Sequence, residues 1–149
     1  MLVSLCDKWT SSVARVLSQK LGMLFCDIAD LLEYDLSEKK AMEDLCSADY
    51  VEKREKGVVK HYLSFENVVS SVDCDVLMHN KEFLDKSNLV VFINVPNDFT
   101  EKNGTAINVI TLDDRKNKLK KLADICINIR KTDEDFVSEK IIEKLREIL

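Results

Sequence analysis

Residues 4–11, which read SLCDKWTS, lie where a phosphate-binding loop would do chemistry. They follow an apolar segment and precede a helical pattern, and such a loop reads G-x-x-x-x-G-K-[ST]. Its glycines let the backbone approach a phosphate, its lysine reaches the terminal phosphates, and its hydroxyl binds Mg²⁺. Of these groups the segment keeps only the hydroxyl, as Ser11. The pattern therefore predicts the place of a nucleotide site that has lost most of its binding groups.

Three substitutions in this segment oppose phosphate binding. Trp9 stands where the second glycine would be, and an indole leaves no room for the backbone to approach a phosphate. Thr10 replaces the lysine, whose charged hydrogen bond is typically worth about 1.5–3 kcal/mol. Asp7 adds a carboxylate, which would repel a phosphate about 4 Å away by roughly 1–4 kcal/mol. Lys8 is the one base in the segment that could reach inward instead.

The elements that would position this segment are a strand before it and a helix after it. Residues 1–3 are apolar, residues 4–10 are expected to form the loop, and a helix then runs to Gly22. The apolar residues of that helix recur at helical spacing (Val13, Leu17, Leu21). A second apolar segment, residues 23–26, leads to Asp27. This order of strand, loop, helix, strand and acid is typical of P-loop kinases.

The rest of the chain alternates between helical and strand patterns. Residues 89–93 are apolar and rich in β-branched types, which predicts a strand buried on both faces, as in a parallel sheet. The alternation in residues 125–129 predicts an edge strand. We expect a further strand over residues 66–72, helices over 35–46, 49–62, 113–123 and from 132–135 onward, one or two helical turns over 81–86, and a loop over 97–108. The fold class is therefore α/β with a mostly parallel sheet.

Length and composition favour one ordinary globular domain over residues 1–149. Hydrophobic residues make up 46% and charged residues 33% of the chain, far from a disordered composition. No apolar run is long enough to span a membrane, and no signal-peptide pattern opens the sequence, so we expect a cytoplasmic protein. A net charge of −5 gives no support to nucleic-acid binding, and the basic stretch 115–121 reads as a solvated helix face.

Cysteine and histidine give little support to a metal or disulfide site. The five cysteines are spread out with no C-x-x-C pair, and the two histidines are far apart in sequence. Cys6, Cys26 and Cys126 lie in apolar stretches, where a small buried hydrophobic residue is the simplest interpretation. We therefore expect no metal centre and no structural disulfide.

Several segments together resemble the shikimate kinase family. Residues 11–27, SSVARVLSQKLGMLFCD, are similar to its S-T-x-G-x-x-L-A-x-x-L-x-x-x-F-x-D, and residues 89–95 resemble its central strand. Residues 114–124 resemble its R-x-P-L-Y-x-E-x-A-D, and Thr132 and Asp133 fall in its adenine-side loop. The resemblance implies a three-layer fold with a five-stranded parallel sheet flanked by helices. It also implies Mg²⁺ and ATP as cofactors, if the protein is active.

The residues that this resemblance assigns to the substrate and to Mg²⁺ are only partly kept. Ser11 and Asp27 match the Mg²⁺-side hydroxyl and acid, and Arg115 matches a substrate-binding arginine. The second acid falls on Ala29, with Asp30 one position away. Each retained residue also has a structural interpretation: Ser11 as a helix-start residue, Asp27 as a helix cap, Arg115 as the partner of nearby acids, and Asp124 as a structural acid.

Three further motifs of the family have also lost their functional residues. Its F-R-x-x-E falls on residues 51–55, where Glu52 replaces the carboxylate-binding arginine and Arg54 lies two residues away. Its glycine triplet falls near residues 71–73, which contain no glycine. Its lid falls on residues 97–108, where Lys102 is the only base. The losses are spread over independent segments, whereas the strand and helix patterns are kept.

These departures favour a protein that keeps the fold without phosphoryl transfer, which depends almost entirely on positioned charge. We expect a degenerate shikimate kinase-like binding or interaction module, with no cofactor. Its partner would be a second copy of itself, a pathway enzyme, or a small ligand held at the ends of the strands. The alternative is a divergent shikimate kinase with weak activity or a rebuilt phosphate site. A third reading is another α/β protein that shares only the fold.

Overall fold

The computed structural model describes residues 1–36, 42, 44–104 and 109–148. Within them, five parallel strands form one sheet in the order β2-β3-β1-β4-β5. Their bounds are β1 (Leu2–Val3), β2 (Leu24–Asp27), β3 (Val68–Ser71), β4 (Val91–Asn94) and β5 (Ile125–Asn128). The predicted α/β class and five-stranded parallel sheet are confirmed, and β5 lies at an edge as predicted. β1, not β4, occupies the centre of the sheet.

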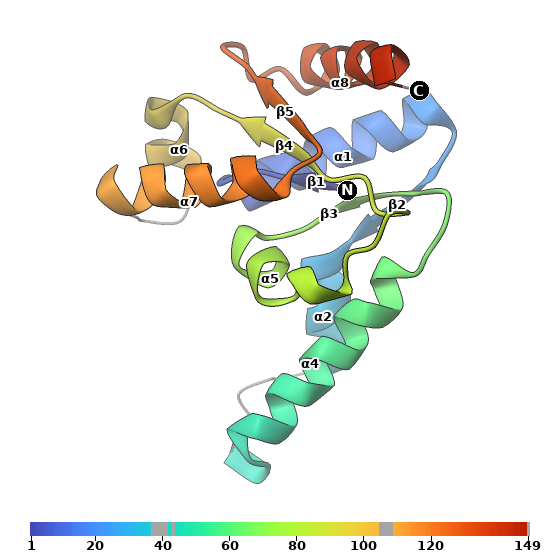
Figure 1. Ribbon diagram of the computed structural model, residues 1–149, viewed down its shortest axis with the longest axis vertical. Helices are drawn as coiled ribbons and strands as arrows, with labels where there is room; N and C mark the ends of the chain where they lie inside the picture. Colours follow the sequence, from blue (N-terminus) through green and yellow to red (C-terminus); the bar gives the residue numbers. More distant parts are fainter. Residues whose placement is uncertain (37–41, 43, 105–108, 149) are drawn as a thin grey trace.

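Helices cover both faces of the sheet and give three layers (Figure 1). Helices α1 and α8 lie on one face, and α2, α4, α5 and α7 lie on the other. Their bounds are α1 (Asp7–Leu21), α2 (Ile28–Leu36), α4 (Ala48–Leu63), α5 (Cys74–His79), α6 (Asn97–Asn103), α7 (Val109–Leu122) and α8 (Glu134–Ile148), with a 3₁₀ turn at Lys81–Phe83. None of the described helices is long and apolar enough to cross a membrane.

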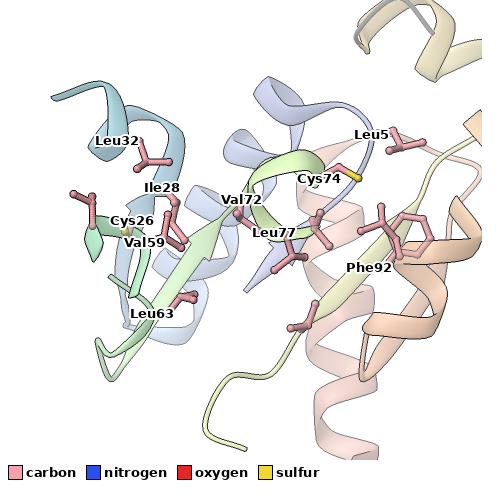
Figure 2. Close-up of a cluster of buried hydrophobic side chains, with 14 of the residues drawn as sticks. Leu5, Cys26, Ile28, Leu32, Val59, Leu63, Val72, Cys74, Leu77 and Phe92 are labelled. Carbon is pink, nitrogen blue, oxygen red and sulfur yellow. The ribbon is translucent and has the colours of Figure 1, made fainter. Parts of the chain in front are cut away.

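Alternation along the strands divides the core between the two faces. In β4, Phe92 packs toward α7 and α5, whereas Val91 and Ile93 pack toward α1 and α8. Figure 2 shows the cluster that contains Phe92, which extends along the sheet through Leu77 to Val59. The side chains of β4 are buried on both faces of the sheet, and this is why its sequence is a continuous apolar run.

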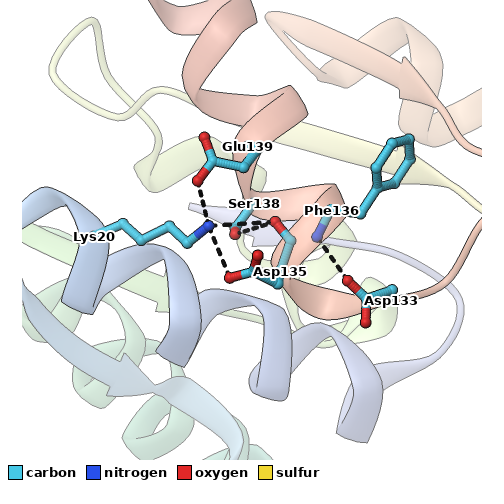
Figure 3. A network of polar contacts seen from close by, with 6 residues as sticks. All are labelled: Lys20, Asp133, Asp135, Phe136, Ser138 and Glu139. Carbon is cyan, nitrogen blue, oxygen red and sulfur yellow. Dashed lines mark hydrogen bonds and ion pairs between the residues drawn. The ribbon is translucent and has the colours of Figure 1, made fainter.

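Helices α1 and α8 are joined by polar contacts at their ends (Figure 3). The Lys20 ammonium lies 2.9 Å from the Asp135 carboxylate and also contacts Glu139. Asp133 caps α8, because its Oδ1 accepts a hydrogen bond of 2.8 Å from the backbone N–H of Phe136. Gly22 ends α1 with a φ of 64°, a left-handed conformation that glycine adopts without strain.

Some expectations about local structure are wrong. Residues 97–103 form α6 and not a loop, because Pro96 begins a helical turn that buries Thr100; residues 105–108 lie outside the described part of the chain. Helix α5 is not anticipated by the apolar pattern, because it has only six residues. The helix expected over residues 35–46 falls partly on residues outside the description.

Two residue-level expectations also need correction. Cys6 and Cys26 are buried, but Cys126 is exposed, because it lies on the outward face of the edge strand β5. Lys116 belongs to the basic stretch expected to be solvated, yet it is only 8% exposed. Its side chain extends from α7 toward the end of β4, where its ammonium donates hydrogen bonds to two oxygen atoms.

Candidate functional site

The candidate site lies at the carboxyl edge of the sheet, where the strands of an open α/β fold present their ligand-binding loops. The segment after β1 opens onto this edge, as does the segment after β3. Asp27 ends β2 and pairs in register with Ser71, the last residue of β3. Residues far apart in sequence are therefore brought to one edge by the parallel order of the strands.

The segment after β1 is shorter than the sequence predicts. Residues 4–10 were expected to be loop, but α1 begins at Asp7, so only residues 4–6 connect the strand to the helix. The Thr10 N–H donates to the Cys6 carbonyl at 2.8 Å, which is an ordinary helical hydrogen bond. Extra helix thus replaces the part of the loop that would wrap around a phosphate.

A buried hydroxyl pair fixes this shortened connection. Ser4 Oγ lies 2.6 Å from Thr10 Oγ1, and both residues are fully buried. Ser4 Oγ also accepts a hydrogen bond of 2.9 Å from the Cys6 N–H. Thr10, at the position of the lysine, is therefore turned into the protein, while Lys8 lies on the exposed side of α1. Ser11 lies one turn inside the helix and not at its start.

Trp9 crosses from α1 to two other elements. Its indole Nε1 donates to the Thr132 carbonyl at 2.9 Å, and its ring meets Phe99 of α6 edge-on, with centroids 5.5 Å apart. The side chain therefore lies between the first turn of α1, α6 and the segment before α8. Because the indole has a hydrogen bond to one element and a ring contact with another, the three elements pack together here.

The segment carrying α6 is packed directly against the connection after β1. A Cβ built at Gly104 would lie 2.6 Å from the Leu5 carbonyl oxygen and 2.6 Å from that of Thr100, so only glycine fits there. The Lys116 ammonium donates to the Val95 carbonyl at 2.8 Å and to Asn97 Oδ1 at 2.6 Å. Burial lowers the pKa of Lys116. These contacts hold α6 down over residues 4–6.

Beside α1, the same edge holds a small acidic cavity of about 190 Å³. Its charged lining residues are Asp7, Asp73, Asp75 and Arg115. Burial raises the pKa of Asp7 to about 7, and the charges of Asp73 and Asp75 act in the same direction. Arg115 lies 3.2 Å from Asp75 and compensates only part of this negative charge. The lining of this cavity therefore carries a net negative charge, which disfavours the binding of anions.

Comparison with known proteins identifies the fold. No family model matches the chain, and no curated protein matches it by sequence. A shikimate kinase from Aquifex aeolicus is 22% identical with a TM-score of 0.74, over 99% of this chain and 97% of that one. Shikimate kinases from Bacteroides thetaiotaomicron (17% identity, TM-score 0.72, 99% and 95% covered) and Acinetobacter baumannii, the latter in complex with shikimate (16%, 0.72, 98% and 92%), match similarly.

The chain has the fold of the shikimate kinases. Identities this low establish a shared fold and not a shared activity. The three matched chains are covered almost completely, so the likeness extends over the whole sheet and its helices.

Within this shikimate kinase fold, the retained acids have structural partners. Asp27 Oδ1 accepts hydrogen bonds from the backbone N–H groups of Ala29, at 3.0 Å, and Asp30, at 3.3 Å, and so caps α2. Asp124 Oδ2 accepts one of 2.8 Å from the Val90 N–H and ties β4 to the start of β5. These bonds account for both acids without a ligand.

The two retained arginines do not converge. Arg115 faces the acidic cavity, whereas Arg54 lines a separate cavity together with Asp35 of α2 and His61 of α4. Glu52, two residues before Arg54, lines a different cavity on the other side of the same helix. Arg54 therefore does not replace the arginine that the resemblance expects at position 52.

The residues at this edge do not fit Mg²⁺-ATP. Thr10 is buried against Ser4, Asp7 has neighbouring acids, and Trp9 occupies the space up to Thr132. Within the described residues, no group of three or more His, Cys, Asp or Glu side chains has the geometry to hold a metal ion.

The sequence analysis missed three residues of this region: Asp73, Asp75 and Lys116. The two acids that flank Cys74, shortly after β3, were the sequence signal that could have pointed to the acidic cavity.

Proposed function

We propose that this protein is a degenerate shikimate kinase-like module that binds a ligand or a partner and does not transfer phosphate. The main support for the proposal is that α1 begins at Asp7, because helical residues then take the place of the loop that would surround a phosphate. Phosphoryl transfer requires several positioned cations and donors, and the Ser4–Thr10 pair takes the place of one of them. A cytoplasmic protein that associates with itself or with another protein, and not with nucleic acid or membrane, is part of the proposal.

A thermal-shift titration with Mg²⁺-ATP, shikimate and both together tests it. We expect no change in melting temperature, because a ligand stabilises the folded state only where it binds. An active shikimate kinase measured in parallel shows that the ligands are competent. A saturable rise of several degrees with Mg²⁺-ATP would contradict the proposal.

A divergent shikimate kinase is the second candidate. Asp27 and Arg115, which match family positions, both lie at the carboxyl edge of the sheet, and this supports a residual site. Shikimate-dependent release of ADP, measured at high protein concentration, decides between the two. Turnover that is lost in Asp27→Asn would establish the enzyme, and its absence would leave the binding module.

A further inference from the structure

The outer side of β5 is an unpaired edge of the sheet. β5 pairs with β4, and no strand of the described residues lies beyond it (Figure 1). The N–H groups of Ile125 and Ile129 donate to carbonyl oxygens of the β4 segment, at 3.1 Å and 3.2 Å. Because backbone groups alternate along a strand, those of Cys126 and Asn128 point away from the sheet, and both residues are exposed. Their N–H and carbonyl groups are therefore left for another strand.

Cations lie at both ends of this edge. Before the strand, the last turn of α7 carries Lys120. Partial burial raises the pKa of the Cys126 thiol and the Lys120 ammonium opposes this rise, so Lys120 lies close to the strand. After the strand, Arg130 and Lys131 follow directly, and both are exposed. The Lys131 ammonium lies 5.6 Å from the ring centroid of Phe136, which holds it near the start of α8.

The acids of the same region already have partners inside the protein. Asp124 ties β4 to the start of β5, Asp133 caps α8, and Asp135 pairs with Lys20. The three cations, in contrast, have no carboxylate partner within the described part of the chain. A strand that carries carboxylates is therefore complementary to this edge. A second copy paired edge to edge would instead bring like charges together.

We propose that the outer edge of β5 binds an extended, acidic segment of a partner protein, which adds to the sheet as a further strand. The backbone groups of Cys126 and Asn128 supply the hydrogen bonds, and the cations at the two ends of the strand select for carboxylates. The inference rests on the proposed function, because it names the kind of partner that the binding module takes.

A short blocked peptide in which glutamate and valine alternate is a suitable probe. Its counterparts are the same peptide with lysine in place of glutamate, and its fully N-methylated form, which has no backbone N–H to donate. Amide hydrogen exchange is followed by NMR. At saturation, the acidic peptide should slow exchange at Cys126 and Asn128 about tenfold and leave Ile129, which already donates to β4, unchanged.

The two counterparts separate charge from backbone pairing. The lysine peptide should give no saturable effect, because it meets like charges at both ends of the strand. The N-methylated peptide should bind about tenfold more weakly, because it cannot donate to the carbonyl groups of Cys126 and Asn128. An acidic peptide that leaves exchange at these two amides unchanged, or equal binding of the lysine peptide, would overturn the proposal.

A charge-reversal variant sharpens the test without disturbing the core. Arg130→Glu with Lys131→Glu should weaken binding of the acidic peptide about tenfold and admit the lysine peptide. Lys81→Glu with Lys86→Glu makes the same change in net charge at exposed residues between α5 and β4, and should leave binding unchanged. Unaltered affinity for the acidic peptide in the first variant would refute the assignment of the cations.

Two other outcomes have distinct readouts. Slow exchange at Cys126 and Asn128 without peptide, increasing with protein concentration, would show a second copy on this edge and overturn the choice of partner. Nucleotide binding is measured separately, so a melting-temperature rise with Mg²⁺-ATP would refute the proposed function and leave the peptide result standing.

Discussion

The indole Nε1 of Trp9 donates a 2.9 Å hydrogen bond to the carbonyl oxygen of Thr132, across 123 residues of sequence. The bond joins the first turn of α1 to the segment before α8, and the same ring contacts Phe99 on α6. One side chain therefore links three segments at the edge of the sheet. In this protein, the position where a phosphate-binding loop carries a glycine is an anchor for packing.

Replacing Trp9 tests this anchor. Trp9→Phe removes the hydrogen bond and keeps a ring, so it should lower the free energy of unfolding by about 1 kcal/mol. Trp9→Ala also removes the ring and should cost about 2–3 kcal/mol, less than a fully buried tryptophan because the side chain is partly exposed. Urea denaturation followed by circular dichroism measures both. Equal midpoints for the wild type and Trp9→Ala would show that the contact is not stabilising.

The Ser4–Thr10 hydroxyl pair should show energetic coupling. Ser4→Ala and Thr10→Val each remove the hydrogen bond between the two hydroxyls, while the remaining hydroxyl keeps a backbone partner at Cys6, so each should destabilise by about 1 kcal/mol. The double variant removes both groups and should lose less than the sum of the single changes, by about 1 kcal/mol. A denaturation-based double-mutant cycle measures this difference. Strict additivity would mean that the pair contributes no specific interaction.

Stability should depend on the ionisation of Asp7. Its pKa is raised in the folded state to about 7, so the folded protein binds this proton more tightly than the unfolded chain does. The resulting stabilisation is complete below the unfolded pKa, near about 4, and is lost as the pH rises through about 7.

Asp7→Asn should accordingly be more stable than the wild type at pH 8, with a smaller loss of stability between pH 4 and 8. Thermal melts across this range measure the effect. Glu134→Gln removes an acid from the first turn of α8 and serves as the control for a helix-start charge. Parallel pH profiles for the wild type and Asp7→Asn would contradict the raised pKa.

Glycine at position 104 should be required, in contrast to glycine at position 57. A Cβ at Gly104 meets two carbonyl oxygens at 2.6 Å, so Gly104→Ala should destabilise by about 1–3 kcal/mol. A Cβ at Gly57, within α4, meets nothing within 4 Å, so Gly57→Ala should stabilise by about 0.5–1 kcal/mol. Chemical denaturation of the two variants shows whether the effect at position 104 comes from packing, because a general effect of alanine on the free energy of unfolding would appear in both. Similar values for both would refute the close approach of residues 4–6.

Restoring the motif should not restore the site. The triple variant Asp7→Gly, Trp9→Gly, Thr10→Lys supplies the glycine and lysine but places an ammonium where a buried hydroxyl now lies. We expect no gain in affinity for a fluorescent ATP analogue, together with a loss of stability, because the connection after β1 is too short to wrap a phosphate. A tenfold gain in affinity would show that only the side chains had changed.

Sequence patterns alone were sufficient for the frame of the molecule. The β-branched run before Pro96 and the alternating isoleucines after Asp124 identified two strands, because strand periodicity is a local property. The start of α8 near residues 132–135 was also predictable, since a capping side chain bonds within its own turn, and the structure has Asp133 as the cap. The missing glycines and lysine of residues 4–11 were visible in the same way.

Only the tertiary structure decided what replaced those missing groups. The Trp9–Thr132 and Ser4–Thr10 contacts and the burial of Lys116 depend on distances between segments that no local pattern encodes. The early start of α1 belongs with them, because its first turn is held by packing against α6 and residues 4–6. Propensity and periodicity act over a few residues, whereas a site is made where distant residues meet, and that is set by the packing of the whole fold.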